Sequence, residues 1–146
     1  MKTIYLFEEI SVSSALKVRE AIDSGEPLLV WLNSPGGDIC SALSIYDAIV
    51  DRDATVIATG ACESAALLVL LGARHRYATR HCRFMYHSVA AVGDLSSPDI
   101  AETAYLSDLI ADIIRERTGT SLAPGPAKVY FGSTEAKEWG FIEEVG

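Results

Sequence analysis

Short apolar runs alternate along this chain with longer segments of helical periodicity. The run at residues 28–32 is apolar at every position, which is typical of a strand in a parallel sheet covered by helices. The other predicted strands are short and span residues 3–7, 55–59, 76–78, 84–87 and 130–131.

Helices are predicted between these strands. Ser13 and Ser14 can cap the first helix, and the Ser97-Pro98 pair has the order favoured where a helix begins. The segment 63–72 is apolar on nearly all sides, which predicts a buried helix. The full set of predicted helices spans residues 13–24, 39–50, 63–72, 98–117 and 133–139. Strands that alternate with helices in this way predict an α/β protein.

The composition favours one globular unit. The chain has 146 residues, of which 49% are apolar, so residues 1–146 are expected to form a single domain with its own core. The 20 acidic and 12 basic residues give a formal net charge of −8. That balance argues against nucleic acid as the main partner, because phosphate binding needs clustered basic side chains.

Neither a membrane role nor a metal site is expected. The longest apolar stretch, residues 65–71, is too short to cross a bilayer, and the N-terminal apolar run is too short for a secretory signal. Cys40, Cys62 and Cys82 contain no CxxC pair. We interpret them as small, reduced core residues of a cytoplasmic protein.

Two local features offer backbone N–H groups to a negative charge. A turn with Gly36 and Gly37 follows the buried strand, and glycines let the backbone approach an oxyanion closely. An ordinary strand-to-helix turn is the alternative. Ser64 comes four residues after Gly60, at the start of the buried predicted helix, where developing negative charge is stabilised. A serine that only caps the helix is the alternative there.

His87 ends a predicted strand, and the strand ends of an α/β sheet gather at one edge. It can be the general base that a serine nucleophile needs, and a half-buried structural histidine is the alternative. His75 and His81 are weaker candidates, because they lie among the arginines of what looks like a solvated basic loop. The six-residue spacing of the three histidines matches no metal site.

Several runs occur in an order that is specific to one family. They are LNSPGG at 32–37, SIYDAI at 44–49, GACES at 60–64, LGA at 71–73, RFMYH at 83–87, FGS at 131–133, EA at 135–136 and WGFI at 139–142. On these runs the chain resembles the proteolytic subunit of the Clp protease, the ClpP family, over nearly its whole length. The resemblance implies the α/β ClpP/crotonase fold, with repeated ββα-type units and an extended handle helix near 98–117.

The resemblance also implies site residues. Ser64 matches the nucleophile and His87 the general base, and Gly37 and Ala65 match the residues whose backbone N–H groups form the oxyanion hole. The residues expected to bind an extended peptide by strand addition are Gly36, Asp38, Ile39 and Ser88. No metal and no cofactor are implied.

The implied partners are a polypeptide substrate and further copies of the chain in a ring, which the handle helix can stack on a second ring. An AAA+ unfoldase is the family's other partner. The short segment before the first predicted strand argues against unfoldase docking, because the family's axial segment has no counterpart in it.

The sequence departs from the family at the triad aspartate, a position held here by Val129. The segment 118–132 contains no Asp or Glu at all. Losing the aspartate that orients the histidine costs orders of magnitude in rate without abolishing catalysis. Asp94 and Asp99 are the nearest acids after the histidine that could replace it, and Lys128 is interpreted as a surface residue.

A second departure lies just before the nucleophile, where the family has small residues and this chain has Cys62 and Glu63. Glu63 could raise the pKa of His87 if its carboxylate points inward, or it could face solvent.

Three functions are therefore compared. The leading hypothesis is a serine endopeptidase that cleaves unfolded proteins or peptides through a Ser64–His87 dyad inside a ring. Val129 favours the second, a weak or inactive structural or regulatory subunit. The third is a crotonase-type acyl-CoA enzyme, which shares the fold and could contact a phosphate through the basic stretch 74–83. That chemistry does not need the serine and histidine pair, which argues against it.

Overall fold

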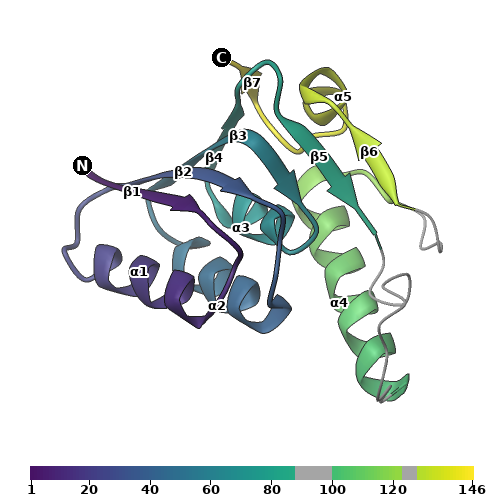
Figure 1. The fold of residues 1–146 in the computed structure, drawn as a ribbon, viewed down its shortest axis with the longest axis horizontal. Helices are drawn as coiled ribbons and strands as arrows, with labels where there is room; N and C mark the ends of the chain where they lie inside the picture. The colour runs from purple at the N-terminus through teal and green to yellow at the C-terminus, as the bar shows by residue number, and fades with distance from the viewer. Residues whose placement is uncertain (88–99, 123–127) are drawn as a thin grey trace.

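The structure describes residues 1–87, 100–122 and 128–146. In this computed structural model a mostly parallel sheet is built from alternating strands and helices (Figure 1). The strands are β1 (Lys2–Phe7), β2 (Leu28–Ser34), β3 (Ala54–Glu63), β4 (His75–Ala78), β5 (Arg83–Tyr86), β6 (Val129–Phe131) and β7 (Glu144–Val145). The helices are α1 (Val12–Ile22), α2 (Ile39–Ile49), α3 (Ala66–Gly72), α4 (Ile100–Thr118) and α5 (Ser133–Glu138). The predicted α/β class is confirmed.

The sheet forks along β3. The first half of β3 pairs with β4, over Thr55–Ala58, and the second half pairs with β5, over Ala61–Glu63. The main path runs β1-β2-β3-β4-β7, and β6 joins the branch by antiparallel pairing with β5. Gly60 lies between the two halves with a φ of 72°, in the left-handed region that favours glycine. The fork brings the ends of β3 and β5 together.

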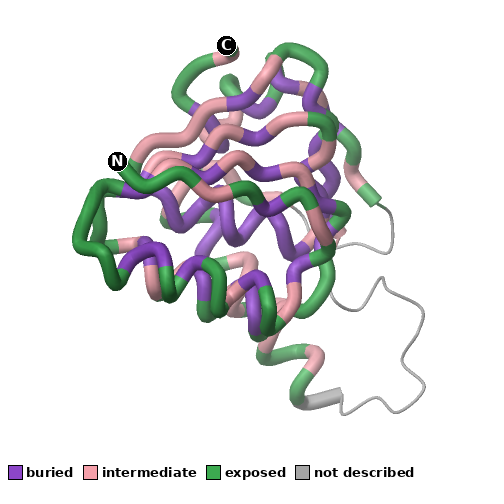
Figure 2. Tube along the Cα trace, turned by 60° about the vertical axis from the view of Figure 1, so that its left-hand side comes forward, coloured by how far each residue is buried: buried purple, intermediate pink, exposed green. Residues whose placement is uncertain are grey.

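Helices cover one face of the sheet. Along β2 the side chains of Leu28, Val30 and Leu32 are buried, and those between them are partly exposed. Figure 1 shows α1, α2 and α3 on the same side of the strands, and Figure 2 shows the buried and less buried positions alternating along them. The continuous apolar run 28–32 therefore does not reflect helices on both sides of β2, because Leu29 and Trp31 are only partly buried.

Two predicted helix starts are corrected, whereas α5 begins at Ser133 as expected. Ser11 caps α1, because its Oγ accepts from the Ser14 N–H at 3.3 Å and Ser14 Oγ accepts from the Ser11 N–H at 3.1 Å. Helix α3 begins at Ala66 rather than at Glu63. Gly132 caps α5 through its N–H, which donates to the Glu135 carboxylate at 3.1 Å.

The long helix α4 is the expected handle. Ile113 and Ile114, near its end, are buried, whereas the side chains of its earlier described turns are exposed or half-buried (Figure 2). Arg117 fixes this end to α3, because its guanidinium donates to the carbonyls of Leu71 and Ala73 at 2.8 and 3.1 Å. The predicted start at Ser97-Pro98 lies outside the described residues.

Two predictions about single residue types are corrected. Cys62 and Cys82 are buried free thiols as expected, but Cys40 is exposed. Arg76 and Arg83 do not belong to a solvated loop: Arg76 donates to the Arg117 carbonyl at 3.1 Å, and Arg83 binds a buried carboxylate. No helix within the described ranges combines the length and the apolar character needed to span a membrane.

Candidate active site

The end of β3 places Ser64 in a strained turn. Among the described non-glycine residues, Ser64 alone has a positive φ, at 56°. This left-handed conformation costs a non-glycine residue about 1–2 kcal/mol. The Ser64 N–H donates to the Met85 carbonyl at 2.8 Å, which ties the turn to β5. Ala65, not Ser64, is the N-cap of α3, so the helix-capping alternative for Ser64 is not what the structure shows.

Two glycines after β2 allow other chain segments to approach closely. A β-carbon at Gly36 would lie 2.8 Å from both the Glu63 carbonyl oxygen and Ser64 Cβ. A β-carbon at Gly37 would lie 2.3 Å from the Ile10 carbonyl oxygen. The turn is therefore more than a generic connection, because only glycine lets it touch both the strained serine and the segment before α1.

The backbone at Gly37 has one edge in use and one edge free. The Ile10 N–H donates to the Gly36 carbonyl at 2.8 Å, and the Ile10 carbonyl accepts from the Asp38 N–H at 2.9 Å. These two bonds form an isolated parallel bridge between Ile10 and Gly37. In such a bridge the N–H and C=O of the middle residue point to the opposite edge. No acceptor within the described residues takes the N–H of Gly37 or that of Ala65.

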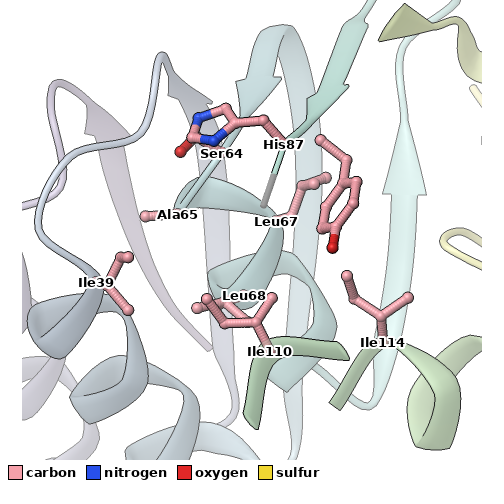
Figure 3. Close-up of a pocket in the computed structure, with 9 residues that line it drawn as sticks. Ile39, Ser64, Ala65, Leu67, Leu68, His87, Ile110 and Ile114 are labelled. Atoms are coloured by element: carbon pink, nitrogen blue, oxygen red, sulfur yellow. The ribbon is translucent and has the colours of Figure 1, made fainter. Parts of the chain in front are cut away.

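His87 follows β5 directly and lines the same pocket as Ser64. Figure 3 shows the imidazole and the serine side chain at one end of this pocket. Apolar side chains line the rest, with about 350 Å³ of empty volume that includes the part open to solvent. They come from α2, α3 and α4, and are Ile39, Leu67, Leu68, Ile110 and Ile114.

One polar group sits among these apolar side chains. Tyr86 lines the pocket and is 5% exposed. Burial raises the pKa of its hydroxyl above the ordinary value.

The other predicted site residues have different placements. The Asp38 carboxylate caps α2 by accepting from the Ser41 N–H at 3.0 Å, and Ile39, the first residue of α2, reaches the pocket. Ser88, Asp94 and Asp99 lie outside the described residues. Lys128 is exposed, as expected.

The contact of Glu63 was not found from the sequence. Its carboxylate is buried and accepts from Arg83 Nη2 at 2.7 Å, so it neither faces solvent nor is aimed at the histidine as its main partner. The partner lies 20 residues further along the chain, and only the β3–β5 pairing brings the two together. Within the described ranges, no three metal-ligating side chains cluster.

The sequence of the whole chain decides the family. The model of the Clp protease family matches residues 3–146. The chain belongs to the Clp protease family. It is 31% identical over 147 aligned positions to an ATP-dependent Clp protease proteolytic subunit of Bacteroides fragilis, covering 92% of this chain and 71% of that protein. A similarly named protein of Bacteroides thetaiotaomicron is also 31% identical, over 92% of this chain and 67% of its own length.

The fold of this Clp protease family member is similar to that of a solved structure. A ClpP1 mutant from Listeria monocytogenes matches with a TM-score of 0.84, covering 99% of this chain and 91% of the other at 23% identity. In this fold Val129, at the position where the sequence resemblance puts the triad aspartate, pairs with Tyr86 in the β5–β6 ladder. The valine therefore lies beside the strand that leads into His87.

Proposed function

We propose that this Clp protease family member is a serine peptidase with Ser64 as nucleophile and His87 as general base. The observation that carries the proposal is the left-handed φ of Ser64 at a strand-to-helix turn that shares a pocket with His87. Such a turn exposes a hydroxyl above a sheet edge, which is the arrangement that nucleophilic serines use. The strained conformation of Ser64 does not serve to cap α3, because the N-cap of that helix is Ala65.

The proposed reaction begins when Ser64 Oγ attacks the carbonyl carbon of the scissile peptide bond. His87 takes the serine proton and later gives it to the leaving amine. The negative charge that develops on the carbonyl oxygen is held by the N–H groups of Gly37 and Ala65, for which the described residues provide no acceptor. Water then attacks the acyl-enzyme with His87 again as base, and the serine is regenerated.

Substrate binding falls to the free edge of the glycine turn and to the pocket. The C=O of Gly37 points to the same edge as its N–H and can pair with an extended peptide, so Gly36 and Asp38 support this edge from their bonds to Ile10. Ile39 and the apolar side chains of the pocket then receive a side chain next to the scissile bond. Ser88 is proposed to continue the binding strand on the other side.

Without the triad aspartate the dyad is expected to be slow. Loss of the residue that orients the histidine reduces kcat by about 10⁴ in a serine protease triad. Backbone donors and binding still supply about 10³–10⁴ over the uncatalysed reaction. A peptidase of low turnover is therefore the expected phenotype.

A fluorophosphonate probe with intact-mass detection tests the proposal. We expect one adduct on Ser64, no adduct for Ser64→Ala, and labelling at least about 100-fold slower for His87→Ala. Peptide cleavage should follow the same order. Absence of an adduct in both the isolated and the assembled protein, or an adduct on another residue, would overturn the assignment.

The second candidate is an inactive subunit that assembles with an active relative, and Val129 favours it. Native mass measurement with and without a co-expressed Clp proteolytic subunit separates the two. A homogeneous homo-oligomer that cleaves peptides excludes the inactive subunit. A chain that assembles only with the active relative and is never labelled supports it. The ring itself, a cytoplasmic location and an AAA+ unfoldase partner are proposals that rest on family membership.

A further inference from the structure

Glu63 is unusual because it is the one charged residue among the buried residues of the described chain. Its side chain is 8% exposed, whereas that of its partner Arg83 is 63% exposed. A carboxylate is costly to bury, and a buried ion pair gives little net stability compared with apolar residues of similar volume. A contribution to stability therefore does not explain why a glutamate occupies the position directly before Ser64.

The ion pair joins the two strands that hold the proposed nucleophile and base. Glu63 is the last residue of β3, and Arg83 is the first residue of β5, which ends just before His87. The two strands pair over only three positions, where Glu63 lies opposite Met85. The 2.7 Å bond from Arg83 Nη2 to Glu63 therefore crosses a short ladder diagonally.

A third strand contacts the same guanidinium. The Arg83 guanidinium carbon lies 6.0 Å from the centre of the Tyr130 ring, and Tyr130 follows Val129 in β6. Cation–π attraction at this distance orients an arginine that would otherwise be mobile at the surface. The carboxylate of Glu63 is thus held by a cation that is itself placed by β5 and β6.

We infer that the Glu63–Arg83 pair positions Ser64: it fixes the strained turn at the end of β3 against the strand that leads to His87. The inference rests on the proposed function for its effect on catalysis, and on the backbone alone for its effect on the turn. Glu63 and Arg83 are positioning residues in this scheme, since neither lines the pocket with Ser64 and His87. Without the pair, the turn is held by the Ser64–Met85 backbone bond and the packing of Gly36.

Four variants are compared with the wild-type protein: Arg83→Gln, Glu63→Gln, Arg83→Lys and the double variant that combines Glu63→Gln with Arg83→Gln. Arg115→Gln is the matched control, because Arg115 Nη2 also binds a carboxylate, that of Asp112, at 2.7 Å, but on α4 and outside the pocket. Three quantities are measured on each: the rate constant of fluorophosphonate labelling, kcat and KM for a peptide, and amide hydrogen exchange at Ser64.

For Arg83→Gln and Glu63→Gln we expect labelling and kcat to fall at least about tenfold while KM changes less than about twofold. Exchange at the Ser64 amide should become at least about tenfold faster. Arg83→Lys should recover part of the rate, Arg115→Gln should change none of the three quantities, and the double variant should lose no more than either single one, because coupled residues are not additive.

The amide exchange separates this inference from the proposed function. If the wild-type protein is not labelled, the peptidase proposal fails, and faster exchange in Arg83→Gln still supports the positioning role. Unchanged exchange in folded Arg83→Gln and Glu63→Gln overturns the inference, whatever the activity. An equal loss in Arg115→Gln, or additive losses in the double variant, also overturns it.

Discussion

At the scale of single residues, the backbone conformation of Ser64 lowers the stability of the protein while it presents the proposed nucleophile. A positive φ costs serine free energy that glycine does not lose, although glycine gives up more chain entropy on folding. We expect Ser64→Gly to be more stable than Ser64→Ala by about 1 kcal/mol, with both variants inactive. Urea unfolding of the three proteins measures this, and equal midpoints for the two variants would contradict a strained turn.

Cys82 gives stability a pH dependence. Burial, and then the nearby Glu63 carboxylate, raise the pKa of this thiol from an ordinary 9.0 to about 12. Above pH 9 the unfolded chain loses the thiol proton and the native chain keeps it, so native stability falls as the pH rises from about 9 toward 12.

Cys82→Ala should therefore reduce the loss of stability per pH unit by up to about 1.4 kcal/mol. Urea midpoints between pH 8 and 10.5 under reducing conditions measure the difference. Cys62, whose pKa is also raised by burial, acts in the same direction and continues to do so in the variant. Parallel pH curves for the two proteins would show that Cys82 does not titrate in this way.

Tyr86 affects which side chain fits the pocket. Its hydroxyl lies among the apolar side chains of the pocket, so an apolar occupant withdraws it from water. We expect Tyr86→Phe to shift the ratio of kcat/KM toward peptides with leucine, against glutamine, before the scissile bond by about two- to tenfold. No change in this ratio would mean that the hydroxyl is hydrated rather than bound by the substrate.

The sequence led to the residues of the site but not to their contacts. Ser64 and His87 stood out because a serine at a turn and a histidine at a strand end are local signals, and the structure brings them to one pocket. Their catalytic roles stay predictions. The Glu63–Arg83 pair, by contrast, depends on a register between β3 and β5 that no local pattern encodes.

At the scale of elements, α4 holds α3 in place. Arg117 donates to two carbonyls at the end of α3, the helix that begins beside Ser64. Removing a charged donor from buried carbonyl acceptors costs about 1–3 kcal/mol, so Arg117→Gln should lower the free energy of unfolding by that amount. Arg115→Gln, an exposed pair on the same helix, should change it by less than about 0.5 kcal/mol. Chemical denaturation of both variants compares them directly.

Element order was predictable because period-two and helical patterns are local. The ends were less so: the first serine cap lies at Ser11 because its hydroxyl and that of Ser14 bond reciprocally, which a serine-rich run does not specify. Strand β3 continues through Gly60, where Asn33 Oδ1 accepts the Ala61 N–H at 3.1 Å and bridges the irregular register. Strand β7 has two residues and is defined by its partner β4, so no local pattern marks it.

At the scale of the whole molecule, the sheet face away from the helices is a candidate surface for association with further copies of the chain. Tyr5 and Phe7 on β1 are 59% and 55% exposed, and their rings pack edge to face at 6.0 Å. Aromatic surface of this kind is typical of interfaces. We expect a native mass that is a multiple of 15.7 kDa, and a shift toward 15.7 kDa in Phe7→Glu.

Light scattering coupled to gel filtration measures the mass, and far-UV circular dichroism confirms that the variant is folded. An unchanged oligomer in folded Phe7→Glu would place the contacts between subunits elsewhere. The apolar run at residues 28–32 predicted a strand in a parallel sheet covered by helices. In the single chain, helices cover one face of β2. An apolar residue on the other face gives the same sequence pattern whether a helix of the same chain or another subunit covers it.

The strained serine also has a meaning for the history of the chain. Glycine at position 64 would relax the turn, because glycine adopts a positive φ without a steric cost. In a lineage that no longer used the hydroxyl, selection for stability would favour that relaxation. A serine held at φ 56° is therefore what selection for its hydroxyl predicts, in a chain with Val129 at the position where the resemblance places the triad aspartate.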